Sequence, residues 1–326
     1  MEILRGANNW KLICRRDRDG VTILKASTCD CRAALPETIW DLPVRALGDH
    51  ALAPGAFEAL DGTEILVTCG PVTGGEEWDT LKLQELWLPD SLERVGDYAF
   101  FNCRQLKRLH LRDTVRYWGG GALMNCRVLD TFDLACTGQE GELLAYFAGE
   151  LPAELDVTLT EPDGETVRLI FPEYQEIYEE NCPAHHFDYN ISGAGYAYHH
   201  CFYQKKLNLK TYDELWRPML GMEHDPDCAL RLAFYRLRMP RDLEAGAEAD
   251  YLSYLRSHTA EAAEWLLRER DTAGLQFLLQ RTEPDRPTLA AACELARTAG
   301  ASEALALLLE EQHRRYPTGA EKRFDL

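Results

Sequence analysis

The sequence contains no long hydrophobic run. No window reaches the roughly 18 consecutive apolar residues that a membrane-spanning helix needs. The first twenty residues have no apolar core of signal-peptide length, because charged residues interrupt them by residue 15. The eleven cysteines are scattered over 326 residues and are not the dense, even set of a small secreted domain. We therefore expect a cytoplasmic protein with reduced thiols that does not bind membranes.

Positive charge is also scarce. The chain has 35 Lys and Arg side chains against 54 Asp and Glu, which gives a net charge of −19. Residues 1–137 hold 16 basic and 20 acidic side chains and so carry −4, which leaves −15 for residues 138–326. An acidic surface repels phosphates, so the composition disfavours nucleic acid as a partner.

Recognisable catalytic motifs are missing as well. The sequence has no nucleophile elbow, no H-E-x-x-H zinc motif and no paired kinase motifs. Adjacent acidic pairs such as Glu179-Glu180 splay around a helix and do not form a catalytic dyad. The stretch "GAGYAY" at 193–198 lacks both the preceding strand and the glycine spacing of a phosphate-binding loop. The sequence therefore predicts no catalytic residue and no cofactor.

A repeat of 23 residues is present. The stretches "LPDSLERVGDYAFFNC" (88–103) and "LRDTVRYWGGGALMNC" (111–126) share their spacing, and the pattern L-x-x-L-x-L occurs four times, once degenerate. The last two apolar positions are two residues apart, so both point to one side of a short strand. No unit can bury that side alone, so we expect a solenoid of stacked units. The aligned positions are Leu60, Leu83, Leu106 and Leu129; Thr63, Leu86, Leu109 and Phe132; and Ile65, Leu88, Leu111 and Leu134.

The segments between the strands repeat too. We expect Gly96 and Gly119 to permit a tight bend. Equivalent residues of successive units should lie about 4.8 Å apart. Cys103 and Cys126 should therefore be neighbouring, reduced thiols that act as small hydrophobes. Two further pairs share positions: Ala99 and Ala122 on the crowded inside, and Asn102 and Asn125 beside turn backbone.

These stretches, together with "LPETIWDLPVRALGDHAL" (35–52), resemble the BspA-like leucine-rich repeats, whose units read roughly I-P-x-x-V-x-x-I-G-x-x-A-F-x-x-C. The resemblance covers about residues 10–137 and implies a leucine-rich repeat domain over 1–137. "WKLICRRDRDGVTIL" before it reads as a capping hairpin with Asp19-Gly20 as its turn. Residues 66–80 have lost the pattern, which predicts a protruding loop.

Stacking should also align exposed residues. One row would hold Glu64, Trp87, His110 and Asp133, and a second row Gly62, Glu85, Arg108 and Thr131. Aromatic and arginine side chains among acidic ones are typical of a protein-binding surface. The alternative is a solvated sheet face with one tryptophan packed on its neighbours. The predicted partner-binding residues are Glu64, Glu85, Trp87, Arg108, His110 and Asp133.

Residues 138–245 form a different, mixed region. The stretch 156–171 predicts a β-hairpin, and helices are expected beyond Pro172, among them 228–239. The region also holds ligand types that zinc prefers, although their spacing matches no known site and consecutive residues on a helix diverge by about 100°. Structural roles are therefore favoured, and a zinc enzyme or sensor is the alternative. The candidate ligands are Cys182, His185, His199 and Cys201.

Residues 246–318 are rich in alanine and leucine and predict an all-α arm. Two segments align at an offset of 30, with Ala262 matching Ala292 and Leu278 matching Leu308. This helix-turn-helix pattern resembles ankyrin repeats, but the T-P-L-H tetrapeptide is missing; an unrelated helical bundle is the alternative. Residues 319–326 predict a flexible tail.

The predicted fold class is therefore α+β: a leucine-rich repeat solenoid with short parallel strands, a mixed middle region and an ankyrin-like helical arm. Two modules of an interaction type flank a region without a recognisable active site. We expect a non-enzymatic adaptor that binds a protein partner through the sheet face and the helical arm. Self-association through an open end of the solenoid is a further alternative.

Overall fold

A computed structural model describes residues 2–55, 60–70, 78–138, 142–181, 186–222 and 224–317. The chain forms two compact units, unit 1 (Met1–His224) and unit 2 (Asp225–Leu326). Within the described residues unit 1 contains strands and helices, whereas unit 2 contains helices only, so the protein is of the α+β class. The sequence predicted domain limits at 137, 245 and 318, and the predicted tail lies outside the described residues.

Unit 1 begins with the predicted hairpin. β2 (Trp10–Arg16) and β3 (Val21–Thr28) pair antiparallel, and the turn is closed by the Asp17 N–H, which donates to the Gly20 carbonyl oxygen at 2.9 Å. The hairpin lies inside a sheet of order β1-β7-β2-β3-β6-β9-β11, with β5 paired to β6. The remaining strands of this sheet are β1 (Glu2–Arg5), β5 (Thr38–Ile39), β6 (Leu42–Leu47), β7 (Thr63–Thr68), β9 (Arg94–Val95) and β11 (Tyr117–Trp118).

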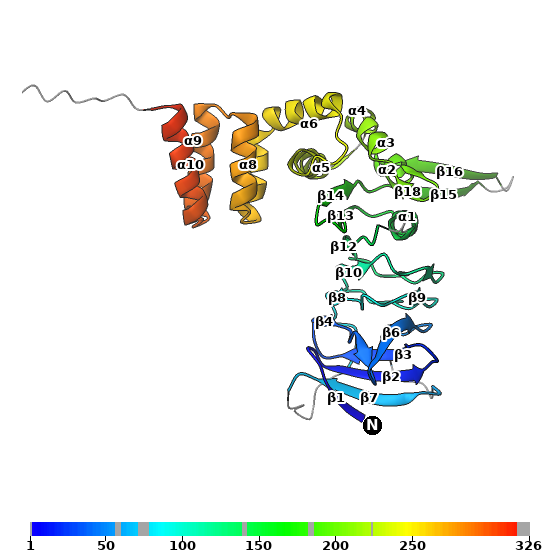
Figure 1. Ribbon diagram of the computed structural model, residues 1–326. Coiled ribbons are helices and arrows are strands. Elements are labelled where there is room, and N and C mark those ends of the chain that lie inside the picture. The colour runs from blue at the N-terminus through cyan, green and yellow to red at the C-terminus, as the bar shows by residue number, and fades with distance from the viewer. Residues whose placement is uncertain are drawn as a thin grey trace, which may run out of the picture. The chain divides into compact units, whose positions relative to one another are not determined.

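The second sheet of unit 1 is the stack of short strands that the repeat predicts (Figure 1). Its order is β14-β13-β12-β10-β8-β4. All neighbours are parallel except β13 and β14, which form the predicted hairpin. Leu86 and Phe132 both pair with Leu109, which confirms the predicted stacking of these positions. The strands are β4 (Arg32–Ala34), β8 (Glu85–Trp87), β10 (Arg108–Arg112), β12 (Thr131–Ala135), β13 (Leu155–Thr160) and β14 (Thr166–Phe171).

The degenerate unit of the repeat, with Leu60, Thr63 and Ile65, does not belong to this stack. The prediction that it stacks with the other three units is therefore wrong. β7, with Glu64 in it, belongs to the first sheet and pairs with β1 and β2. Its apolar residues Ile65 and Val67 are buried against the N-terminal hairpin, whereas Leu60 is 38% exposed. The predicted loop over 66–80 is also wrong in part, because β7 runs to Thr68; residues 71–77 lie outside the described part of the chain. β4 occupies the predicted place beside β8.

Glycine is required where successive coils approach each other most closely. A Cβ added to Gly96 would lie 2.5 Å from the Gly48 carbonyl carbon, and one added to Gly119 would lie 2.4 Å from that of Gly96. Neither residue has a positive φ. These glycines are therefore needed for space between backbones, and not for the tight bend that the sequence predicted.

The other repeated positions are also stacked. Asn102 and Asn125 adopt φ of 64° and 63°, and the Asn125 side-chain amide donates to the Asn102 Oδ1 at 3.1 Å. The Cys103 and Cys126 thiols are free and buried, and each donates to a carbonyl oxygen, of Leu52 at 3.2 Å and Phe100 at 3.1 Å respectively. Burial raises the pKa of Cys126 to about 12, so this thiol stays protonated and unreactive.

Side chains cover the backbone at both ends of the stacked sheet. On β4, the Ala34 N–H donates to the Asn8 Oδ1 at 2.8 Å, and the Trp10 indole N–H donates to the Ala34 carbonyl at 2.7 Å. On β14, the Ile170 N–H donates to the Tyr212 hydroxyl at 3.1 Å, and that hydroxyl donates to the Ile170 carbonyl at 2.6 Å. These contacts use backbone groups with which another strand would pair.

The rest of unit 1 follows the stacked sheet. The prediction of helices beyond Pro172 is wrong for the residues that follow directly, because β15 and β16 form a separate antiparallel pair. In β16, Phe187, Tyr189 and Ile191 alternate with polar residues, a pattern that favours a strand, whereas β15 contributes only Ile177 and Tyr178 of these residue types. The elements are α1 (Leu143–Glu150), β15 (Gln175–Asn181), β16 (His186–Ser192), α2 (Gly195–His199), β17 (Phe202–Tyr203), β18 (Lys206–Leu207), α3 (Leu209–Glu214) and α4 (Trp216–Leu220).

Unit 2 is built from helical hairpins. The aligned residues Ala262, Ala292, Leu278 and Leu308 are all buried, while Leu309 on the last helix is 44% exposed. Helices α7 and α9 contact each other, as do α8 and α10. The ankyrin-like character of this unit stays a prediction. The helices are α5 (Pro226–Arg238), α6 (Ala245–Ser257), α7 (Thr259–Arg268), α8 (Thr272–Thr282), α9 (Arg286–Thr298) and α10 (Ser302–Arg315).

We expect the Gly119→Ala change to destabilise unit 1, because the new methyl group would overlap the backbone of the preceding coil. Overpacking of this kind costs about 1–3 kcal/mol. The matched control is Gly120→Ala, where a Cβ meets nothing within 4 Å and the effect should stay below about 1 kcal/mol. Urea denaturation followed by tryptophan fluorescence measures both. Equal midpoints for the two variants would contradict the close approach.

Candidate protein-binding face

The face of the stacked sheet that points away from the core carries two rows of polar side chains, here called the outer strand face. The first row is Arg32, Glu85, Arg108, Thr131 and Asp156, and the second is Ala34, Trp87, His110, Asp133 and Thr158. The stacking brings five of the six predicted residues together. Glu64 does not join them, because β7 pairs elsewhere.

An ion-pair network links these rows. The imidazole of His110 lies between two carboxylates: its Nε2 is 2.8 Å from Glu85 Oε1, and its Nδ1 is 3.0 Å from Asp133 Oδ2. The Arg108 guanidinium lies 3.3 Å from Asp133 and 3.9 Å from Glu85. Arg32 on β4 approaches Glu85 at 3.1 Å. Each carboxylate therefore contacts more than one positive or hydrogen-bonding group.

This network shifts two pKa values in opposite directions. Burial lowers the pKa of His110, but the hydrogen bonds and charges of Asp133 and Glu85 outweigh burial, so the pKa is raised above its usual value. Burial raises the pKa of Asp133, but the His110 hydrogen bond and the Arg108 charge outweigh it and lower the pKa. The structure thus favours a charged His110 between two carboxylates.

Trp87 packs on this network. Its ring is stacked on the His110 ring, with centroids 4.3 Å apart and planes inclined by 4°. The residue is nevertheless 37% exposed. The imidazole holds the indole in place, so its exposed part is presented in a fixed orientation. Trp87 thus packs on a neighbour, which is what the alternative of a solvated sheet face predicted. Part of its indole is nevertheless exposed to solvent.

Sequence reasoning missed Arg32 and the contribution of β4. A signal for it was present, since the stretch "RAALP" (32–36) aligns with "ELWLP" (85–89) on the shared Leu-Pro. That alignment places Ala33 beside Leu86, as the structure does. The interval between these two stretches is longer than the 23 residues of the repeat. The pair between Arg168 and Asp156, with distances of 2.7 and 2.5 Å, was not predicted either, and it extends the polar face onto β14.

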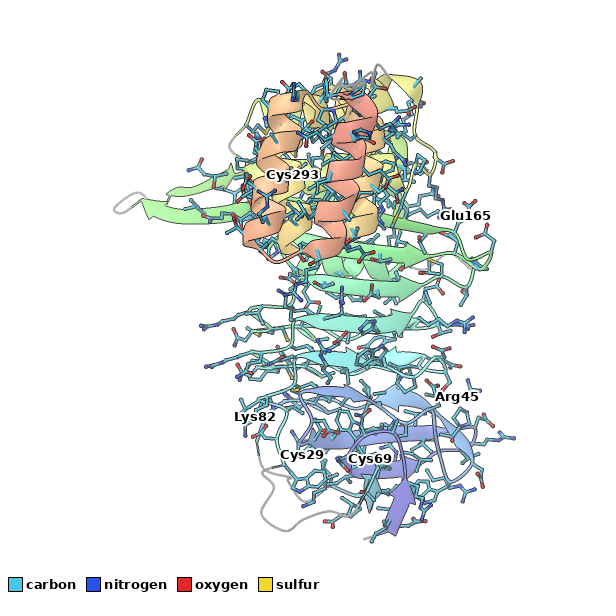
Figure 2. All side chains as sticks on the ribbon, turned by 90° about the vertical axis from the view of Figure 1, so that its left-hand side faces the viewer. Cys29, Arg45, Cys69, Lys82, Glu165 and Cys293 are labelled. Atoms are coloured by element: carbon cyan, nitrogen blue, oxygen red, sulfur yellow. The ribbon has the colours of Figure 1, made fainter. Side chains whose placement is uncertain are left out.

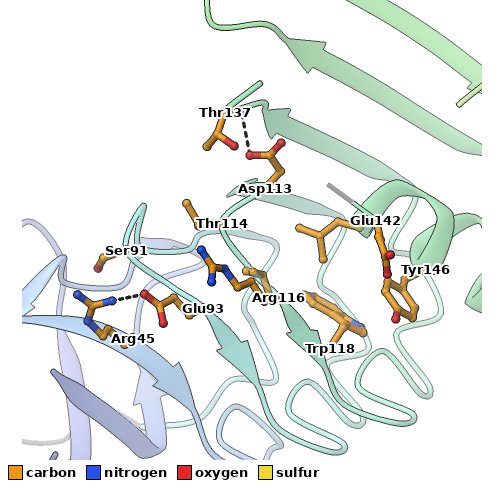
Figure 3. A pocket seen from close by; sticks show the side chains of 12 residues that line it. Arg45, Ser91, Glu93, Asp113, Thr114, Arg116, Trp118, Thr137, Glu142 and Tyr146 are labelled. Atoms are coloured by element: carbon orange, nitrogen blue, oxygen red, sulfur yellow. Dashed lines mark hydrogen bonds and ion pairs between the residues drawn. The ribbon is translucent and has the colours of Figure 1, made fainter. Parts of the chain in front are cut away.

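A second feature of unit 1 is a polar groove of about 620 Å³ beside β9, β11 and α1 (Figure 3). Arg45 and Glu93 on one side of it form an ion pair. Asp113 accepts a hydrogen bond from the Thr137 N–H at 2.7 Å, and Trp118 and Tyr146 contribute aromatic rings. The mixed charges of this groove do not select one class of ligand.

The candidate metal ligands are not brought together in the described residues. His199 is buried, and its Nδ1 and Nε2 lie 2.8 and 2.9 Å from the carbonyl oxygens of Ala148 and Pro172. Burial raises the pKa of the Cys201 thiol to about 12. Cys182 and His185 lie outside the described residues. Within those that are described, no group of three or more His, Cys, Asp or Glu side chains is arranged so that it could hold a metal ion.

Residues 77–140 match the family profile of the "BspA type Leucine rich repeat region (6 copies)", which supports the leucine-rich repeat resemblance for this segment. No curated protein is significantly similar to the chain. In the described part of the chain no helix is long and apolar enough to cross a membrane.

Two solved structures are similar to parts of the chain. One is a leucine rich cell surface protein from Faecalibacterium prausnitzii, with 16% identity over 47% of this chain and 43% of that one, and a TM-score of 0.24. The other is a leucine rich repeat protein from T. pallidum, with 21% identity over 40% of this chain and 75% of that one, and a TM-score of 0.22. The match thus spans less than half the length of the first protein.

We expect NMR titration to give His110 a pKa above the usual value of about 6.5, and Asp133→Asn to lower it. A raised folded-state pKa means that the stabilisation is fully present below the unfolded-state pKa and is lost as pH rises through the folded-state pKa. In His110→Gln, that pH dependence should disappear, and the missing resonance assigns the titrating signal. A His110 pKa at or below 6.5 would contradict the two carboxylate contacts.

Proposed function

We propose that the protein is a non-enzymatic interaction protein that binds a protein partner through the outer strand face. The observation that carries the proposal is the ordered group of Trp87, His110 and Arg108 held by Glu85 and Asp133. Tryptophan and arginine are enriched among residues that dominate binding energy. Fixing their rotamers before binding reduces the entropy lost on association.

The wider proposal is an adaptor. Its first docking surface is the face of a leucine-rich repeat solenoid, which the in-register strands and the family match to residues 77–140 support. Its second is an ankyrin-like helical arm, supported by the buried residues that recur at an offset of 30. We also propose a cytoplasmic location, which fits the free, buried thiols of Cys103 and Cys126.

The test is a double variant, Trp87→Ala with Arg108→Ala. It should weaken capture of a partner from a lysate of the native organism at least tenfold, because it removes the exposed indole and the guanidinium. Glu85 keeps contacts to Arg32 and His110 in this variant, so unit 1 should stay folded. Quantitative mass spectrometry of captured proteins gives the readout, and circular dichroism checks folding.

The matched control removes the same kinds of side chain from the other sheet. Arg94 lies over the ring of Tyr117, with 4.5 Å from its guanidinium carbon to the ring centroid, and Tyr117 is 43% exposed. The Arg94→Ala, Tyr117→Ala double variant should therefore capture partners as the parent protein does. Undiminished capture by the outer-face variant would refute the proposed function.

A further inference from the structure

The pair of strands β15 and β16 has properties that the leucine-rich repeat region does not explain. It forms a two-stranded sheet that joins no other sheet in the described residues. Figures 1 and 2, which view the molecule at right angles, both show it projecting from the rest of unit 1. The side chains of residues 175–177 and 189–192 are all exposed, so along these residues neither face of the pair is covered.

Exposed apolar residues occur on both faces of this pair. Glu176 lies opposite Ile191, and Ile177 lies opposite Asn190. Ile191 (39% exposed) and Tyr189 (46%) therefore share one face, and Ile177 (41%) lies on the other. An isolated two-stranded hairpin is only marginally stable in water. An additional strand would bury part of this apolar surface and pair with open backbone groups.

The charge of this region indicates which kind of strand could pair with its edges. Between residues 169 and 204 the sequence has five carboxylates and neither lysine nor arginine. A second copy of the same pair would bring like charges directly opposite one another, which is destabilising. A strand with basic side chains would instead neutralise the carboxylates, and its charge would speed association.

We infer that the β15–β16 pair is a docking site for an extended, basic segment of another protein, in which lysine or arginine alternates with apolar residues. The segment adds as a third strand to an open edge. Its backbone supplies hydrogen bonds, its basic residues meet the exposed carboxylates of Glu173 and Glu176, and its apolar residues cover Ile177 or Ile191. The inference does not rest on the proposed outer strand face, with which it shares no residue.

The test uses the full chain and a synthetic peptide, Lys-Ile-Lys-Val-Lys-Val-Lys-Ile-Lys, blocked at both ends. Hydrogen exchange read by mass spectrometry should show slower exchange within 175–192 when the peptide is present, and fluorescence anisotropy of labelled peptide should give its affinity. The Glu173→Lys, Glu176→Lys variant should bind at least tenfold more weakly. Glu303→Lys with Glu310→Lys, the same charge change made on exposed residues of unit 2, should bind like the parent protein.

Three results would overturn the inference. The first is no protection within 175–192, and the second is equal affinity for a peptide in which proline replaces the apolar residues, because proline cannot complete a strand ladder. The third is concentration-dependent protection of the same residues by the protein alone, which would make a second copy the occupant. Trp87→Ala with Arg108→Ala should leave peptide binding unchanged, so failure here and failure of the proposed function are distinguishable.

Discussion

Backbone hydrogen bonds between successive coils are the interaction on which unit 1 depends. They are not confined to the strands: the Gly96 N–H donates to the Leu47 carbonyl at 2.9 Å, the Gly119 N–H to that of Val95 at 2.9 Å, and the Phe100 N–H to that of Ala122 at 2.9 Å. Such bonds hold the coils at nearly the spacing of strands in a sheet. Side chains between coils must therefore fit that spacing, and where two backbones cross, only glycine fits.

A stack held in this way exposes two edges, and the chain deals with each through side chains. Trp10 is fully buried and still places its indole N–H on the backbone of β4, while Tyr212, also fully buried, both donates to and accepts from Ile170 on β14. Each ring thus extends the apolar core and satisfies polar backbone at the same time. The capped ends contrast with the uncapped β15–β16 pair of the same unit.

The parts of the fold that could be predicted are those set by a local period. Leu86, Leu109 and Phe132 recur every 23 residues and stack in register, because each unit buries the same side of its strand. β4 could not be found from that period, since its interval to β8 is longer and its inward residue is only Ala33. Because the repeat predicted the strand of Glu64 beside β8, where β4 lies, the predicted site contained Glu64 and lacked Arg32.

The long-range pairs could not be predicted from any period. Nothing in the local sequence states that Asn8 reaches Ala34 or that His199 faces two carbonyl oxygens, since these contacts are fixed only when distant segments meet. The paired strands β15 and β16 were hidden for a different reason. Phe187, Tyr189 and Ile191 of β16 do alternate with polar residues, but the nearby Cys182, His185 and His186 are also residue types that bind zinc.

The acidic surplus of the protein gives its two surfaces different physical characters. On the outer strand face, Glu85 and Asp133 are each matched by a guanidinium and an imidazole, so the charges of this surface are already paired. The proposed partner would be recognised by shape and by the exposed parts of Trp87 and Arg108 with these ion pairs kept intact, since breaking them would leave half-buried charges unmatched. The stretch from 169 to 204 has no cation of its own from lysine or arginine. The exposed carboxylates of Glu173 and Glu176 would attract a basic segment from a distance, and this attraction weakens as the salt concentration rises.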